Sequence, residues 1–452
     1  MEKYIEIKDT ILLFDNYGTD SQSLHTSFRA AGYKFPAVVI EDDGFLPDDV
    51  MSVYGFFLGS FGEVYGEQAR PKYFNEITVP EYWEISGNNT SGSVHDLYRK
   101  RGKIFYTEPL HKRRVKIVDW YDEKEVVRVS DHYNRYGAVF ARTTFNSKGQ
   151  RFCKSYFSAG GQEIIVENFA TKDIILNDGG ETRIFHSKTE FIVYFLEKAG
   201  FENSRIFFNT LSTPFFVSNR LTSEEKRDIL FWQEPVRDDI PGNMQVIFKG
   251  KASRTAAVMV QKRQAFDKLA ALGADPDMIH RLGFIYPFAK ENRHRPKALI
   301  CTNSDHIEQC GEIVQALPEM HFCIAALTEM SSKLTSMDNY ENVSIYPGVK
   351  QEVLDGLFEE CDFYLDINHG GEIVSAAHRA FLHNQLIFAF EETVHNRDYV
   401  AETQIYPAGR SDRLIHDLRK AMEDAEVLEQ RIQSQHETAM AEAPERYAEL
   451  CK

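Results

Sequence analysis

The chain has 452 residues, of which 43% are hydrophobic and 27% are charged, and its formal net charge is -16 at pH 7. This length is too great for one hydrophobic core, so we expect two or three domains. The acidic balance excludes a broad nucleic-acid-binding surface, because such a surface needs clustered Lys and Arg to neutralise phosphates.

The sequence carries no pattern of a membrane span or of a disulfide framework. Residues 1–10 (MEKYIEIKDT) lack the apolar stretch of a signal peptide, and no run of apolar residues approaches the roughly 18 that a spanning helix needs. The six cysteines include no CxxC pair and mostly lie in apolar segments, which indicates reduced, buried thiols. We expect a cytoplasmic protein without a metal ion or cofactor, with peripheral binding to the cytoplasmic face of the cell membrane left open.

Residues 1–50 are expected to begin a Rossmann-like domain. ILLFD predicts a buried strand, and the following helix is expected to start at Asp20 or Ser21 and to end at Gly32. PAVVI, which begins at Pro36, predicts the next strand. Strand, helix and strand in this order are typical of a parallel sheet.

Residues 51–190 are predicted to form an inserted antiparallel β-sheet domain. Short runs of alternating apolar and polar residues, such as RRVKIVDWYD and AVFARTTFN, are separated by turns rich in Asn and Gly. Alternation leaves one face of a sheet free, and on this face basic and aromatic residues indicate a protein-binding surface, with a merely solvated face as the alternative. The candidates for that interface are Arg114, Lys116, Trp120 and Arg142.

Residues 191–288 are expected to complete the first Rossmann-like domain. A helix is predicted to end at Gly200. Further predicted elements are strands at 205–208, 215–217, 245–248 and 282–287, a short helix over SEEKRDILFW, and a long helix from about Ser253 to Leu272.

Beyond a polar linker at 289–296, residues up to 410 are expected to form a second doubly wound domain. Its predicted strands are KALICT, HFCIAAL, VSIYPG, DFYLDI and LIFAF, with helices that start near Asp305, Ser331, Lys350 and Gly371. Residues 411–452 carry apolar residues at helical spacing and predict one long C-terminal crossover helix, broken before Pro444. The fold class is therefore α/β and GT-B-like.

A βαβ unit over residues 362–390 places a glycine turn after a buried strand. Ligands of open α/β sheets bind beyond the carboxyl ends of the strands, so this turn is where the chain should present polar groups to a ligand. For each residue alone, a structural role such as a helix cap is the alternative. The candidates for binding an acceptor or a sugar are Lys249, Arg254, Thr302, Asn303, Ser304, Asn368, His369, Gly370, Gly371 and Glu372.

Several uncommon segments occur in an order that resembles a known family. The run LLFDNYGTDSQSLHTSFRAAGYKFPAVVIEDDGFLPDDVMSVYGFFLG, then EYWEI, INHGGEI and AFEETVHN, is similar to the glycosyltransferase-stabilising GtfB family of the accessory Sec system. The resemblance implies pairing with a catalytic glycosyltransferase subunit of GtfA type. It also implies binding of a serine-rich repeat polypeptide whose Ser and Thr receive GlcNAc from UDP-GlcNAc before export.

The resemblance also implies where catalytic carboxylates would lie. Retaining enzymes of this type carry an E-x7-E pair around the same turn. When the pair is aligned by the turn glycines, Asn368 stands at the position of the first Glu and Ala376 at that of the second. When Glu372 is taken as the first Glu instead, Ala380 stands at the position of the second. Because neither Asn nor Ala supplies a negative charge, we expect no catalytic residues and a non-catalytic subunit. The alternatives are an independently active retaining UDP-GlcNAc-dependent glycosyltransferase, and a sugar-binding or chaperone protein that works without a transferase.

Overall fold

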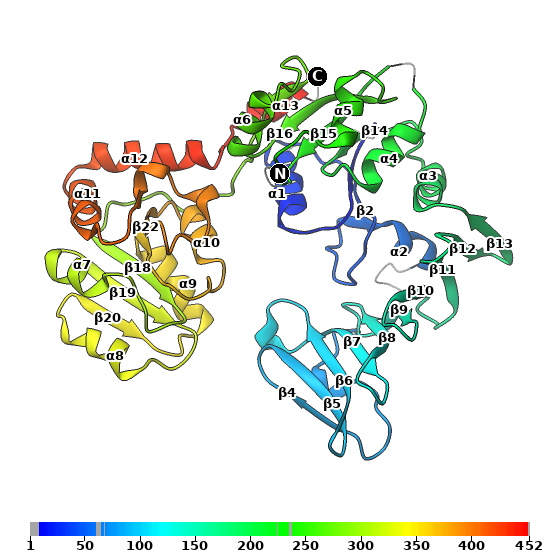
Figure 1. Cartoon of the computed structure of the whole chain (residues 1–452), viewed down its shortest axis with the longest axis horizontal. Coiled ribbons are helices and arrows are strands. Elements are labelled where there is room, and N and C mark those ends of the chain that lie inside the picture. The colour runs from blue at the N-terminus through cyan, green and yellow to red at the C-terminus, as the bar shows by residue number, and fades with distance from the viewer. Residues whose placement is uncertain (1–8, 60–64, 67, 224, 235–236, 451–452) are drawn as a thin grey trace. The chain divides into compact units, whose positions relative to one another are not determined.

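The computed structural model describes residues 9–59, 65–66, 68–223, 225–234 and 237–450. The chain forms two compact units (Figure 1). The first comprises Met1–Met259 and Lys268–His280, and the second comprises Val260–Asp267 and Arg281–Lys452. Each is described by itself below.

The first unit contains a sheet with the strand order β17-β16-β15-β14-β1-β2-β3 among the described residues. Its central strands are fully buried apolar runs that pair in parallel, β1 with both β2 and β14. The strands are β1 (Thr10–Phe14), β2 (Ala37–Val39), β3 (Val50–Ser52), β14 (Arg205–Phe208), β15 (Asp228–Trp232), β16 (Thr255–Val260) and β17 (Ile279–Arg281). The helices that accompany them are α1 (Thr19–Ala30), α2 (Val53–Leu58), α3 (Lys188–Ala199), α4 (Thr213–Arg220), α5 (Gly242–Phe248) and α6 (Arg263–Ala271).

Several elements predicted between residues 213 and 287 are wrong. The segments predicted as strands at 215–217 and 245–248 lie in α4 and α5, and ILFW, predicted as helix, belongs to β15. The single long helix from Ser253 is instead β16 followed by α6. The strand predicted at 282–287 is not formed: β17 ends at Arg281, and Phe284 makes only an isolated β-bridge. Burial explains the errors: TAAVMV consists of good helix formers and β-branched residues, and the buried sheet position of β16 decides its conformation.

A ten-stranded antiparallel sheet lies between β3 and α3 in the chain, as counted over the described residues. Every strand pairs with its sequence neighbour, so the sheet is a continuous meander (Figure 1). Its strands are β4 (Glu84–Gly87), β5 (Ser91–Asp96), β6 (Arg99–Tyr106), β7 (Val115–Tyr121), β8 (Val127–Tyr133), β9 (Val139–Phe145), β10 (Arg151–Phe157), β11 (Glu163–Asn168), β12 (Ile174–Asp178) and β13 (Glu181–Phe185).

The antiparallel sheet joins the parallel sheet at a close backbone contact. Gly44 has φ +85°, and an ideal Cβ on it would lie 2.5 Å from the carbonyl oxygen of Tyr133, at the end of β8. Residues 50–58 form β3 and α2, and β3 extends the parallel sheet beside β2. The predicted domain boundaries themselves stay a prediction.

The second unit contains a parallel sheet with the order β20-β19-β18-β21-β22-β23, which is the arrangement of a doubly wound dinucleotide-binding sheet. Apolar side chains on both faces of the sheet form its two cores. The strands are β18 (Lys297–Thr302), β19 (His321–Ala326), β20 (Val343–Tyr346), β21 (Phe363–Asp366), β22 (Leu386–Phe390) and β23 (Ile405–Tyr406). The first helices are α7 (Cys310–Ala316), α8 (Ser332–Thr335), α9 (Gln351–Glu360) and α10 (Ala376–Leu382).

The C-terminal segment forms three helices in place of the single predicted one. These are α11 (Ser411–Glu423), α12 (Ala425–Thr438) and α13 (Pro444–Leu450). Asp424 ends α11 in an extended conformation, and its carboxylate accepts a hydrogen bond from the backbone N–H of Glu426 at 2.9 Å, which caps α12. None of the helices in the described part of the chain is long and apolar enough to cross a membrane.

These three sheets confirm the predicted α/β fold, with two Rossmann-like sheets and an inserted antiparallel sheet, as expected of a GT-B-like chain.

Candidate functional site

The predicted glycine turn lies at the point where the strand order of the second unit reverses. β18 and β21 are neighbours in the sheet and run in parallel, so their carboxyl ends lie side by side. Thr302 is the last residue of β18, and Asn368 follows β21 by two residues. Such a switch point is the general ligand site of doubly wound sheets. The structure therefore brings together eight of the ten predicted site residues.

Two of these residues lie inside the protein. Asn368 is 2% exposed and Thr302 is fully buried. Thr302 Oγ1 lies 2.8 Å from Asn368 Oδ1 and 2.7 Å from the carbonyl oxygen of Ser304. Asn368 Nδ2 donates to Asn303 Oδ1 at 3.3 Å. Thr302 and Asn368 thus hold the turn together through bonds to the chain itself, and their role as ligand contacts stays a prediction.

The other turn residues shape the entry into α10. Glu372 is exposed, but its Oε1 accepts a hydrogen bond from the backbone N–H of Ala377 at 2.9 Å, so it caps the helix. Val374 and Ser375 both adopt left-handed backbone conformations, with φ +48° and +50°. A β-branched residue such as Val pays a steric penalty there, and strain of this kind clusters at functional turns.

Three side chains meet on the outer side of the turn. His369 Nε2 lies 2.6 Å from Glu308 Oε2, and the His369 ring stacks on that of His306 with centroids 3.9 Å apart. A hydrogen bond from His369 holds the pKa of the Glu308 carboxyl below its ordinary value. Sequence analysis found only His369 of these three. Glu308 is 61 residues away in the chain, and no short-range spacing connects it to His369.

His395 is a further residue that sequence analysis missed. Its Nδ1 lies 2.6 Å from the buried carboxylate of Asp366, and its Nε2 lies 2.8 Å from the carbonyl oxygen of Gly370. The hydrogen bond to Asp366 raises the pKa of His395 to about 9, so the ring is a cation at neutral pH. It then donates from both nitrogens and ties the turn to the end of β21. His395 lies in the AFEETVHN segment, whose isolated His gave no signal of its distant partner.

The remaining two candidates, Lys249 and Arg254, lie in the first unit. Lys249 is exposed at the end of α5. Arg254 is 1% exposed, and its guanidinium donates to Asp228 Oδ1 at 3.0 Å and to the carbonyl oxygen of Ser204 at 2.6 Å. A buried charge needs such partners, because desolvation without them costs several kcal/mol. Arg254 therefore has a structural role in the first unit, and its role as a ligand contact stays a prediction.

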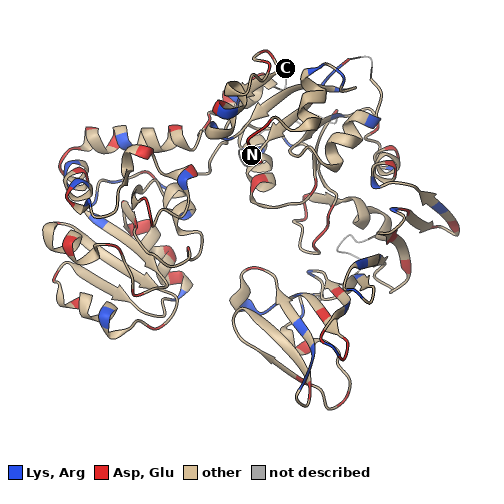
Figure 2. Cartoon of the chain, in the orientation of Figure 1, with Lys and Arg blue, Asp and Glu red and all other residues tan. Residues whose placement is uncertain are grey.

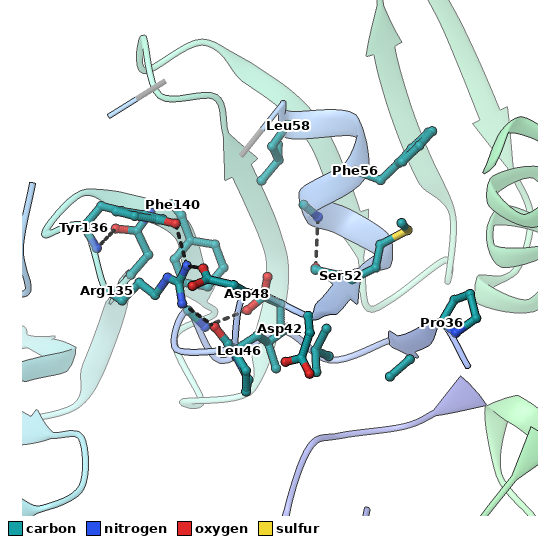
Figure 3. A pocket seen from close by; sticks show the side chains of 18 residues that line it. Pro36, Asp42, Leu46, Asp48, Ser52, Phe56, Leu58, Arg135, Tyr136 and Phe140 are labelled. Atoms are coloured by element: carbon teal, nitrogen blue, oxygen red, sulfur yellow. Dashed lines mark hydrogen bonds and ion pairs between the residues drawn. The ribbon is translucent and has the colours of Figure 1, made fainter. Parts of the chain in front are cut away.

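A pocket of about 250 Å³ in the first unit lies where the loop after β2 meets the turn between β8 and β9 (Figure 3). Arg135 reaches across it and donates to the carbonyl oxygen of Leu46 at 3.0 Å and to the hydroxyl of Tyr136 at 2.8 Å. It also pairs with Asp48. Burial raises the pKa of the Asp42 carboxyl, which accepts the backbone N–H of Gly44. These groups bond within the chain, so we interpret the pocket as the joint between the two sheets.

The four predicted interface residues lie on or beside strands of the antiparallel sheet, where basic and acidic residues are interspersed (Figure 2). Trp120 Nε1 and Arg142 Nε both donate to the carboxylate of Asp131, at 2.9 and 2.6 Å. Lys116 Nζ pairs with Asp43 at 2.7 Å. Arg114, just before β7, is exposed. Three of the four thus have partners within the chain, and the interface itself stays a prediction.

Protein-family models match most of the chain. They are described as the GtfB N-terminal domain (residues 11–57), the GtfB middle domain (83–186), the GtfB third domain (188–272) and the GftB/GlyA-F C-terminal domain (298–435). The turn and its partners named above lie within the match to the C-terminal domain. The other two candidates, Lys249 and Arg254, lie within the match to the third domain.

Relatives of known name are similar over nearly the whole chain. The UDP-N-acetylglucosamine–peptide N-acetylglucosaminyltransferase stabilizing protein GtfB of Streptococcus agalactiae is 43% identical over 97% of this chain and 98% of its own length. The protein of the same name from Streptococcus gordonii is 42% identical over 94% of both chains.

A solved structure agrees with this similarity. A chain in the crystal structure of a GtfA/B complex bound to UDP and GlcNAc superposes with a TM-score of 0.91 at 41% identity, and the match covers 97% of this chain and 98% of that one. The structure of accessory secretory proteins 1, 2 and 3 from Streptococcus pneumoniae has a TM-score of 0.57 at 10% identity, which shows likeness of fold alone. The chain therefore belongs to the GtfB family of glycosyltransferase-stabilising proteins.

Proposed function

We propose that this chain is the non-catalytic, stabilising subunit of a peptide N-acetylglucosaminyltransferase and pairs with a catalytic subunit of GtfA type. The likeness to the chain in the GtfA/B complex carries this proposal, because it extends over 97% of the chain with a TM-score of 0.91. The names of the relatives, which describe stabilising proteins, support it.

The turn at the switch point supports the non-catalytic part of the proposal. Position 368, where the first glutamate of an E-x7-E pair would lie, is a buried Asn that bonds to Thr302. Position 376, where the second would lie, is a buried Ala at the start of α10. A carboxylate at either position would be desolvated and would displace the contacts that hold the turn.

A stabilising subunit should protect the catalytic subunit from unfolding, because a partner that binds only the folded state adds its binding free energy to stability. The test is the thermal unfolding of the catalytic subunit with and without this chain, at fixed concentration. An upward shift supports the proposal, and unchanged unfolding with no co-elution in gel filtration argues against it.

The surface around the turn is also proposed to bind the acceptor polypeptide. Asn303, His369 and Glu372 are exposed around the turn and can hydrogen-bond the hydroxyls of an extended Ser/Thr-rich polypeptide or of a sugar. We propose a serine-rich repeat polypeptide as the ligand of this surface. Fluorescence anisotropy of a labelled Ser/Thr-rich peptide tests it, with a peptide of the same length in which Ser and Thr are replaced by Ala as the control.

We also propose that the complex binds peripherally to the cytoplasmic face of the cell membrane. Flotation of the complex with anionic lipid vesicles tests it directly. Recovery of the complex only in the vesicle-free fraction would argue against peripheral association.

One observation favours the alternative of an independently active transferase. His369 has a carboxylate partner in Glu308 at 2.6 Å, which is the arrangement of a histidine general base. Turnover by the chain alone distinguishes the two functions.

A further inference from the structure

The outer side of the glycine turn is built on a short antiparallel backbone pairing. Ile307 and Asn368 form an isolated β-bridge, the backbone N–H of His369 donates to the carbonyl oxygen of His306 at 3.1 Å, and that of Glu308 donates to Ile367 at 2.8 Å. Successive residues of an extended segment point to opposite faces. Ile307 packs against the core and Asn368 is buried, whereas their neighbours His306 and His369 are exposed and Glu308 is half-buried.

The outward side chains are His306, Glu308 and His369, and they converge. One nitrogen of each histidine and one oxygen of the carboxylate all lie within 4.8 Å of one another. The donors of a tetrahedral zinc ion lie about 2.0–2.2 Å from the metal, which puts them roughly 3.4 Å apart. The 2.6 Å between His369 Nε2 and Glu308 Oε2 is shorter than that spacing, and the 4.8 Å within which all three donor atoms lie is compatible with it. Small side-chain rotations suffice to reach it, because the side chains of His369 and Glu308 are 25% and 20% exposed and are not packed on all sides.

A second layer of contacts orients these side chains. Gln309 Nε2 donates to the other carboxylate oxygen of Glu308 at 3.2 Å, and Gln309 Oε1 in turn accepts the backbone N–H of Ser411 at 3.1 Å. The backbone N–H of His306 donates to Ser304 Oγ at 3.0 Å. Metal sites in proteins depend on such outer contacts to hold the ligating groups in place.

We propose that His306, Glu308 and His369 bind a divalent transition-metal ion, with Zn²⁺ as the best match. Two imidazoles and one carboxylate suit zinc and similar borderline metals, whereas Mg²⁺ and Ca²⁺ prefer oxygen ligands alone. Three protein ligands at a partly exposed site leave a fourth position for water or for an oxygen of a bound molecule. No metal-binding spacing is visible in the sequence, because the ligands come from two segments 61 residues apart.

The test uses the full chain without a histidine tag. Equilibrium dialysis against Zn²⁺ with elemental analysis measures stoichiometry, and the visible absorption of added Co²⁺ reports direct ligation. We expect one equivalent of metal per chain and intense Co²⁺ bands. His306→Ala, His369→Ala and the nearly isosteric Glu308→Gln should each weaken binding at least tenfold, because even the loss of an outer-shell contact typically costs 10–100-fold.

His416→Ala is the matched control, because His416 is exposed in the same unit and lies outside the cluster. It should bind metal as the unaltered chain does. Far-UV circular dichroism confirms that each variant is folded, and Glu308→Gln keeps the shape of the site if an alanine variant unfolds. The proposal is overturned by the lack of a stoichiometric site in the unaltered chain, or by folded variants of the three ligands that bind as His416→Ala does. In that case the cluster is only an ion pair with a stacked histidine.

Discussion

The side chain of Asn303 occupies the space beside Gly370 so closely that an ideal Cβ on Gly370 would lie 1.8 Å from Asn303 Oδ1. Asn303 comes from the loop after β18, and Gly370 comes from the turn after β21. The same Asn303 oxygen accepts the side-chain amide of the buried Asn368. The glycine thus makes room for the Asn303 side chain between two neighbouring strand ends, where Asn303 bonds to Asn368 on the floor of the candidate site.

Gly370→Ala should displace Asn303 and leave Nδ2 of Asn368 without its partner. We expect a loss of about 1–2 kcal/mol in the free energy of unfolding, the usual cost of a buried donor that loses its hydrogen bond. Gly371→Ala is the control, because its nearest neighbour, Asn303 Nδ2, would lie at an ordinary 3.8 Å. Urea unfolding measures both variants. Equal stability of the two would contradict the packing role of Gly370.

The link between His395 and Asp366 predicts a pH dependence of stability. Hydrogen bonding to Asp366 raises the pKa of His395 in the folded chain to about 9, above the ordinary 6.5, with a smaller contribution from Glu372. A raised pKa stabilises the fold fully below about pH 6.5, and this stabilisation is lost as the pH rises through about 9.

The difference in unfolding free energy between the unaltered chain and His395→Gln should therefore shrink between pH 6.5 and 9. Urea unfolding at a series of pH values measures it, with His416→Gln as the control for an exposed histidine. A difference that stays constant with pH would show that His395 is not held as a cation.

The close contact at Gly44 is predicted to hold the antiparallel sheet against the parallel sheet within the first unit. In Gly44→Ala the new Cβ would lie 2.5 Å from a backbone oxygen of Tyr133 and 2.8 Å from the ring of Phe140, at φ +85°. We expect a loss of about 2–4 kcal/mol from overlap and backbone strain together.

Gly32→Ala isolates the strain, because Gly32 has φ +87° and no atom within 4 Å of its Cβ position. It should cost about 1 kcal/mol. If thermal unfolding shows the same loss for both variants, the contact with Tyr133 does not hold the sheets together.

Arg114 is the cleanest probe of the predicted partner interface, because it is exposed whereas Lys116, Trp120 and Arg142 have partners within the chain. Arg114→Glu should lower the affinity for the catalytic subunit without changing the fold. Lys148→Glu makes the same charge change at an exposed hairpin and is the control. Affinity is measured by calorimetric titration of the two subunits, and equal affinities for both variants would place the interface elsewhere.

Five strands of the second unit's sheet, β18 to β22, were predictable because they are mostly buried apolar runs with helices between them. The two-residue β23 (Ile405–Tyr406) was not predicted. The position of the turn followed from the same pattern. The helices and strands of the first unit were harder to predict, because runs such as VIF and ILFW are too short for periodicity to distinguish helix from strand.

The site was only partly predictable for a different reason. Which polar residues gather at the turn followed from chain order, but which of them bond to each other depends on pairs such as His369 with Glu308 and His395 with Asp366. These pairs are 61 and 29 residues apart. The burial of Thr302 and Asn368, which lets them support the turn, was not predictable from the sequence either.

We propose that this chain stabilises a glycosyltransferase without catalysing transfer itself. The most direct measurement is the transfer of radiolabelled GlcNAc from UDP-GlcNAc to a Ser/Thr-rich polypeptide by this chain alone, by the catalytic subunit alone, and by the two together. We expect no transfer by this chain alone and more transfer by the pair than by the catalytic subunit alone. Transfer by the purified chain alone, abolished by His369→Ala, would show that the chain is itself a transferase and would contradict the proposed non-catalytic function.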